Sequence, residues 1–183
     1  MKNLLFKITA LIIVVSCNKN ITENAKLISI DNNKFEFELP KYSRDITEEF
    51  KSTAYETNDI IIFTALCDTI NERNLFLVSK YIEDYKWTID EAFTVSVETS
   101  TNNNLGNLLD NFQLVDYKTY ELQGKTFRYK ISKHYNSVYS IMFYFMKNDY
   151  SNELYEIKMT ADKKGLSRAL YLTEKVALSV KIK

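Results

Sequence analysis

Residues 137–146, SVYSIMFYFM, are apolar at nearly every position. Successive side chains of a β-strand point to opposite faces of the sheet. A strand that is apolar at both odd and even positions therefore has to be covered on both faces. We expect this segment to be the central strand of a sheet with other elements packed on each side.

Other segments show the patterns of strands with turns between them. Phe35, Phe37 and Leu39 alternate with charged residues and end at Pro40, and the Asp31-Asn32-Asn33 run before them predicts a hairpin turn. Gln123-Gly124 predicts a second turn. The expected strands besides 137–146 are residues 26–30, 34–40, 59–66, 74–82, 113–122, 125–135 and 153–160.

Two long helices are expected. Thr88-Ile89-Asp90-Glu91 fits a capping box and predicts a helix over residues 89–99. Residues 105–112 are compatible with a short second helix, and residues 44–58 with either one helical turn or a polar loop. The chain closes with an amphipathic helix whose predicted apolar stripe is Leu166, Ala169, Leu170, Thr173, Val176, Ala177 and Val180.

Strands, a helix, more strands and a closing helix in one chain predict an α+β sandwich with a mostly antiparallel sheet. With 45% hydrophobic residues but only three Gly and one Pro, the composition is globular. The element order, with the FEFELP strand at 35–40, resembles the Mog1/PsbP-like fold over residues 26–183. This resemblance implies a binding or assembly factor and not an enzyme, and it transfers no functional residue.

The N-terminus has the pattern of a secretory signal. Lys2 and Lys7 precede an uncharged run, residues 8–15, that is too short to span a membrane. Val14-Val15-Ser16-Cys17 resembles the lipobox of bacterial lipoproteins. That resemblance implies cleavage between Ser16 and Cys17 and a diacylglyceryl thioether on Cys17. The alternative is an ordinary secretory signal with a chance cysteine.

The predicted organisation is a signal peptide at 1–16, a lipidated tether at 17–25 and one domain at 26–183. Asn18 is not the aspartate that resembles an inner-membrane retention signal, and the run NKNITEN at 18–24 lacks the acidic cluster that resembles a surface-export signal. We therefore expect the outer membrane, facing the periplasm, ahead of the cell surface. A Gram-positive surface lipoprotein would carry the same lipobox.

Few residues point to catalysis or to a cofactor. Cys67 and His134 are far apart in the sequence and have no local motif for a nucleophile pair. One histidine and one available cysteine do not make a typical zinc site, and the acidic pairs lack a calcium-loop pattern. We expect no metal, no cofactor and no catalytic residue. Equal numbers of basic and acidic residues, 24 each, without a basic stripe also argue against nucleic acid.

The remaining candidates concern partners and modification. Tyr81, Tyr85 and Trp87 lie just before the capped helix, and Tyr and Trp are frequent anchors of protein interfaces. The competing interpretation is that Trp87 packs the start of the helix onto the core. Asp68-Thr69-Ile70 resembles the O-glycosylation sequence of some Bacteroidota envelope proteins, which makes Thr69 a candidate acceptor.

The leading hypothesis is a non-enzymatic, lipid-anchored envelope protein that binds a protein partner. The alternative is a carrier of a small apolar or aromatic ligand, and a hydrolase is the third. A partner-binding domain predicts an exposed apolar patch near Trp87, a carrier predicts an enclosed apolar cavity, and a hydrolase predicts a polar cleft that contains His134 or perturbed carboxylates.

Overall fold

The computed structural model describes residues 24–53, 60–67, 74–102, 113–134 and 137–183. In these ranges the strands are β1 (Ala25–Ile30), β2 (Phe35–Pro40), β3 (Arg44–Asp45), β4 (Ile61–Leu66), β5 (Leu75–Thr88), β6 (Gln113–Leu122), β7 (Lys125–Lys133), β8 (Tyr139–Phe145), β9 (Tyr150–Ala161) and β10 (Lys181–Ile182). The helices are α2 (Thr47–Thr53), α3 (Ile89–Asn102) and α4 (Leu166–Ser179).

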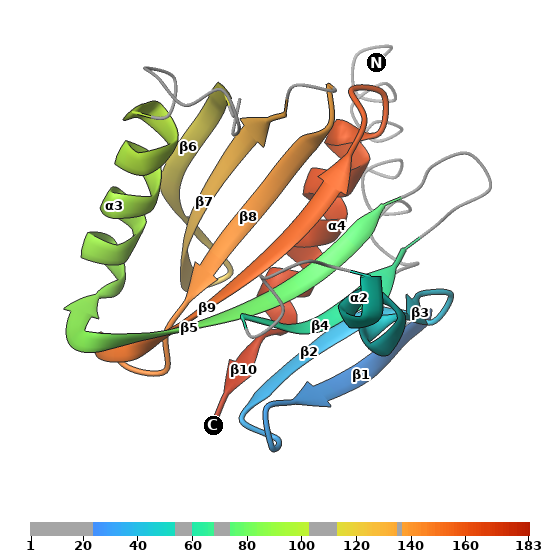
Figure 1. Cartoon of the computed structure of the whole chain (residues 1–183), viewed down its shortest axis with the longest axis horizontal. Helices are drawn as coiled ribbons and strands as arrows, with labels where there is room; N and C mark the ends of the chain where they lie inside the picture. Colours follow the sequence, from blue (N-terminus) through green and yellow to red (C-terminus); the bar gives the residue numbers. More distant parts are fainter. Residues whose placement is uncertain (1–23, 54–59, 68–73, 103–112, 135–136) are drawn as a thin grey trace, which may run out of the picture.

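The strands form two sheets. A seven-stranded sheet has the order β3-β4-β5-β9-β8-β7-β6, and a three-stranded sheet has the order β1-β2-β10. Every described strand pair is antiparallel. In Figure 1 the small sheet lies beside the β4–β5 side of the large one, and α3 stands at the opposite side, near β6 and β7. The predicted α+β sandwich is confirmed.

Strand β8 occupies the central position that its sequence predicts. Its neighbours are β7 and β9, and Ile141 and Phe143 point into the main core between the large sheet, the small sheet and α4. Met142 and Tyr144 point to the other face, where they pack with Ala92, Phe93 and Leu154 in a second cluster under α3. Both faces of β8 are thus covered, as expected from its two-sided apolar pattern.

The main core is rich in aromatic rings, and these connect the two sheets. Phe35, Phe37 and Leu39 of β2 are fully buried. The Phe37 ring packs against Phe63 and Phe76 of the large sheet, with centroid distances of 5.5 Å in each case. The period-two pattern of β2 therefore marks the face that the small sheet presents to the large one.

Both predicted turns are present. Asp31, Asn32 and Asn33 have φ angles of 52°, 55° and 64°, which Asn and Asp tolerate better than other residues with a Cβ. Gln123 and Gly124, with φ of 54° and 73°, connect β6 to β7. The glycine meets the requirement for a positive φ at the second turn position.

The capping box of α3 forms as predicted. The Thr88 backbone N–H donates to Glu91 Oε2 at 2.7 Å, and the Glu91 N–H donates to Thr88 Oγ1 at 3.2 Å. The helix continues to Asn102, three residues beyond the predicted end at 99. Strand β5, in turn, runs to Thr88 instead of ending near residue 82, because it continues past a register shift in its pairing with β9.

The closing helix α4 packs on the main core with nearly the predicted stripe. Ala169, Thr173, Val176 and Ala177 are buried, and so is Leu172, which the stripe did not include. The predicted Leu166 and Leu170 are only partly buried beside the core, and Val180 is the C-cap residue. The face that the core covers is thus wider than the predicted stripe.

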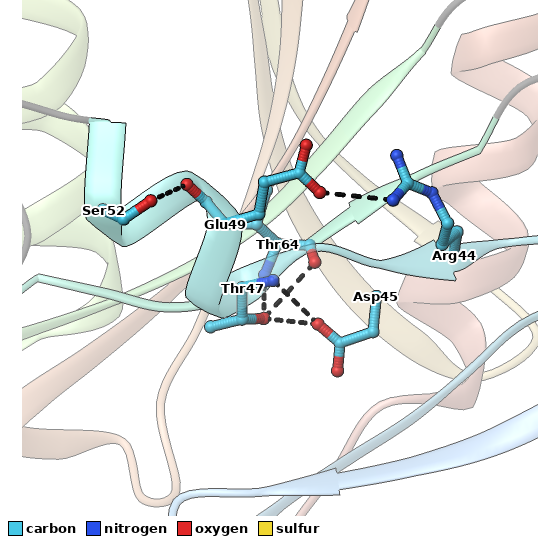
Figure 2. Close-up of polar contacts among 6 residues, drawn as sticks. All are labelled: Arg44, Asp45, Thr47, Glu49, Ser52 and Thr64. Atoms are coloured by element: carbon cyan, nitrogen blue, oxygen red, sulfur yellow. Dashed lines mark hydrogen bonds and ion pairs between the residues drawn. The ribbon is translucent and has the colours of Figure 1, made fainter.

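The segment left open between helix and loop forms β3 and the short helix α2. Figure 2 shows how polar contacts hold its start: Asp45 Oδ1 accepts hydrogen bonds from the Thr47 backbone N–H at 2.9 Å and from Thr47 Oγ1 at 2.7 Å. Thr47 Oγ1 also accepts from the Thr64 backbone N–H at 2.9 Å. These contacts fix α2 on β4. The short helix predicted at 105–112 lies outside the described residues.

Candidate functional site

A cleft of about 250 Å³ lies between α3 and the face of the large sheet that α3 covers. Its apolar walls combine three aromatic residues of β5 and β8 with aliphatic residues of α3 and β9. These residues are Tyr81, Trp87, Tyr144, Ala92, Val95 and Leu154. Polar residues, including Lys130 of β7 and Glu156 of β9, complete the lining.

Lys130 is a buried lysine, with 7% of its surface exposed. Its Nζ donates to the Ser96 carbonyl at 3.0 Å, to Ser96 Oγ at 2.6 Å and to Ser100 Oγ at 2.8 Å. An ammonium group has three N–H donors, so these bonds occupy its full donor capacity. They also fasten α3 to β7, which is 30 residues and more away in the chain.

A second buried charge lies in the same cleft. Glu156 has 6% of its surface exposed. Burial lowers the pKa of Lys130, and the Glu156 carboxylate opposes this effect. Burial, reinforced by the charge of Glu156, raises the pKa of the Tyr144 hydroxyl well above its usual value. Glu156 thus acts on both groups, and its charge opposes the effect of burial on Lys130.

Ser96 connects these groups. Its Oγ accepts from Lys130 and lies 2.8 Å from the Tyr144 hydroxyl. Because the Ser96 oxygen accepts from the ammonium, its own proton is available for the Tyr144 oxygen. The cleft floor is therefore a polar network built from α3, β7 and β8.

Trp87 forms the edge of the cleft at the end of β5. Its ring is partly buried against the cluster under α3 and contacts the ring of Tyr85 edge-on, with a centroid distance of 5.3 Å. The indole Nε1 is buried and has no hydrogen-bond acceptor in the described part of the chain. Such an unsatisfied donor is unfavourable in a folded protein.

No family model matches this sequence, and no curated protein matches it. Among solved structures, the solution structure of cyanobacterial PsbP (CyanoP) from Synechocystis sp. PCC 6803 is similar. It aligns with a TM-score of 0.57 and 11% sequence identity, over 87% of this chain and 93% of that one.

The chain has a PsbP-like fold. At 11% identity this similarity concerns the fold alone, and it confirms that part of the expected Mog1/PsbP-like resemblance.

The PsbP-like domain brings two of the three predicted interface aromatics to the cleft. Tyr81 and Trp87 line it, whereas Tyr85 lies outside it with 60% of its surface exposed. Trp87 also contacts the cluster that contains Ala92, which is the contact expected of a residue that precedes the helix cap. Trp87 thus combines the packing role with a position on the cleft.

The domain does not bring Cys67 and His134 together. Cys67 follows β4 and is fully buried beside Ser43, with Sγ 3.3 Å from Ser43 Oγ. His134 follows β7, and the four strand spacings between β4 and β7 correspond to roughly 19 Å. His134 Nε2 instead lies 2.6 Å from Ser140 Oγ, and Ser140 is 2% exposed.

The other predicted sites fall outside the described residues: Ser16 and Cys17 of the lipobox, and Thr69. Within the described ranges, no group of three His, Cys, Asp or Glu residues is placed to hold a metal ion. No helix in those ranges has the length and hydropathy needed to cross a membrane.

The sequence did not indicate Lys130 and Glu156 as site residues. A signal was nevertheless present, because each interrupts a strand whose neighbouring positions are apolar. Since β8 has to be covered on both faces, its neighbours β7 and β9 also present two covered faces, and a charge there has to be buried.

Proposed function

We propose that this protein is a non-enzymatic, lipid-anchored envelope protein whose PsbP-like domain binds a protein partner through the cleft beside Trp87. The observation that carries the proposal is an aromatic cleft directly beside an exposed tyrosine. Tyr85, 60% exposed, contacts the ring of Trp87, and Val95 on the opposite wall is 47% exposed. Aromatic residues around a pocket are typical anchors of protein interfaces.

The size of the cleft favours a side chain of a partner over a whole ligand. Its volume of about 250 Å³ is below the range of about 300–1,000 Å³ typical of small-molecule sites. An apolar carrier would also need an enclosed apolar cavity, whereas this cleft contains the buried charges of Lys130 and Glu156. The partner-binding proposal therefore agrees better with the cleft than the carrier does.

Attachment to the membrane is proposed on the lipobox alone. A diacylglyceryl thioether on Cys17 with a further acyl chain would give a stable anchor, because one chain binds only marginally. The expected place is the outer membrane, with the domain facing the periplasm.

Cross-linking in cells tests the partner proposal. The full acylated chain is cross-linked, extracted in mild detergent and captured as wild type, as Tyr85→Ala and as Tyr171→Ala. Tyr171 is a matched control because it is an exposed tyrosine, at 40%, on α4, which packs on the other face of the large sheet. We expect one reproducible cross-linked partner that Tyr85→Ala loses and Tyr171→Ala retains. Equal recovery with all three chains would contradict the proposed surface.

The anchor has a separate test. Cys17→Ala should leave the precursor unacylated and uncleaved. A mature-sized Cys17→Ala product that stays in the membrane fraction would contradict the lipoprotein proposal.

A further inference from the structure

We infer that the occupant of the cleft is a basic side chain, a lysine or arginine presented by the protein partner. This inference rests on the proposed function and specifies which chemistry the cleft selects. It follows from the supply of hydrogen-bond donors and acceptors in the cleft, from its aromatic walls and from the charges around it.

The cleft is not built for an anion, although it contains a lysine. All three N–H groups of Lys130 already donate to Ser96 and Ser100. No donor of this ammonium group remains for a carboxylate or phosphate unless α3 moves away from β7.

The cleft lining does contain carboxylate acceptors. Glu83 and Glu156 both line the cleft, and an ionised carboxylate can only accept hydrogen bonds. Glu156 offsets the buried charge of Lys130, so the carboxylate of Glu83 leaves the lining with one negative charge. One additional cation would neutralise it, and buried charges are stable when paired.

The aromatic walls favour the same occupant. Tyr81 and Trp87 line the cleft together, and the face of an aromatic ring attracts a cation within about 6 Å. The methylene stem of a lysine or arginine can pack on apolar residues such as Leu154 while its charged end reaches the carboxylates.

The chain segment that borders the cleft, from the end of β5 through α3, is also acidic. The segment from residue 83 to residue 100 contains five acidic residues and a single basic one, Lys86. Asp90 is paired with Arg128 and Glu91 is used by the helix cap, which leaves Glu83, Asp84 and Glu98. Such a surface attracts a basic partner and repels an acidic one.

The indole of Trp87 points to a peptide and not to a free amine. Its buried Nε1 finds no acceptor in the described ranges. A backbone carbonyl of the partner, next to the basic side chain, would supply one once the indole turns toward the cleft on binding. A simple alkylamine carries no such acceptor.

The single tryptophan makes this inference testable by NMR, because the chain has one indole N–H resonance and it belongs to Trp87. The full acylated chain in lipid nanodiscs is titrated past about 1 mM with four capped tripeptides. Their central residues are lysine, arginine, norleucine and glutamate, and butylamine is a fifth probe. We expect the lysine and arginine peptides to shift the Trp87 indole resonance more than the other three probes.

Variants locate the charge that is recognised. Glu83→Gln should weaken binding of the lysine peptide about tenfold, because a charge-assisted contact is lost. Glu98→Gln, also on the acidic surface but outside the cleft lining, is the matched control and should change affinity less than about twofold. Glu156→Gln removes the charge of the second carboxylate and should also weaken binding of the lysine peptide. The comparison uses this variant when its NMR spectrum keeps the dispersion of the wild-type spectrum.

The outcomes separate the inference from the proposed function. Equal shifts with the norleucine peptide, or with butylamine, would overturn the basic peptide as occupant. No shift with any peptide would also overturn the basic peptide as occupant. If Tyr85→Ala nevertheless loses the cross-linked partner, the proposed function would still be supported. Another outcome is that the lysine peptide binds selectively while the Tyr85→Ala chain still recovers the partner. That pair of results would support the cleft chemistry but refute the proposed interface.

Discussion

Asp31 Oδ2 and Lys80 Nζ, 49 residues apart in the chain, lie 2.8 Å from one another. Lys80 also forms an ion pair with Glu153 at 3.2 Å, and the Tyr155 hydroxyl donates to Asp31. The Asp31 and Lys80 side chains are only 17% and 10% exposed. This cluster fixes the turn between β1 and β2 on the large sheet.

Removal of this cluster should destabilise the protein. Asp31→Asn leaves Lys80 with one carboxylate partner, and we expect the free energy of unfolding to fall by about 2 kcal/mol at pH 7. Urea denaturation measures the change. Glu49→Gln is the control. The side chains of Glu49 and Arg44 are 65% and 62% exposed, so their ion pair contributes at most about 1 kcal/mol. Equal losses for both variants would contradict the assigned role.

The contribution of Asp31 should depend on pH. Burial raises the pKa of Asp31, but the hydrogen bonds from Lys80 and Tyr155 outweigh burial and the net pKa is lowered. A lowered carboxyl pKa stabilises the fold above the ordinary value of 3.8, and this stabilisation disappears as the pH falls through the folded value. The difference between wild type and Asp31→Asn should therefore shrink below about pH 4.

Phe35 should be a major contributor to the contact between the sheets. It is fully buried and stacks on Tyr155, with ring centroids 4.6 Å apart and an interplanar angle of 21°. Phe35→Ala should reduce the free energy of unfolding by about 4 kcal/mol, through lost burial and the cavity left behind. Thermal or urea unfolding measures this loss. Tyr117→Ala, on the exposed edge strand, should change it by less than about 0.5 kcal/mol.

The N-cap of α3 can be tested alone. Thr88→Ala removes the hydroxyl that accepts from the Glu91 N–H, and we expect a loss of about 1 kcal/mol in unfolding free energy. Thr88→Ser keeps the hydroxyl and should recover most of that loss. If serine and alanine destabilise equally, the cap hydrogen bond is not what stabilises the start of the helix.

Lys130 should make the free energy of unfolding depend on pH in the alkaline range. Burial lowers its pKa from the ordinary value of 10.5, with Glu156 acting in the opposite direction and Lys158 reinforcing burial. Below pH 10.5 the unfolded chain therefore holds this proton more tightly than the folded chain, so raising the pH stabilises the fold through this group. Lys130→Met lacks the effect. The difference in unfolding free energy should shift in favour of wild type between pH 7 and pH 10, and a constant difference would contradict the assigned burial.

Much of the architecture was predictable from local patterns. The two-sided apolar run of β8 predicted its central position, the Thr88–Glu91 box predicted the start of α3, and the asparagine-rich turn predicted the first hairpin. These features depend on residues close in the chain and on the period of the backbone. The end of β5 was less predictable, because its last residues do not alternate and remain paired with β9 beyond a register shift.

By itself, then, the sequence determined the fold class, the turns and the helix start, because periodicity and capping act over a few residues. Only the tertiary structure decided where the cleft lies and which residues line it. Lys130 meets Ser96 and Ser100 because α3 packs against this face of the sheet beside β7, and Glu156 lies opposite Tyr144 of β8 and Ser79 of β5 because of the pairing of β9 with both strands. Such contacts depend on strand register and helix placement, which the whole core fixes at once.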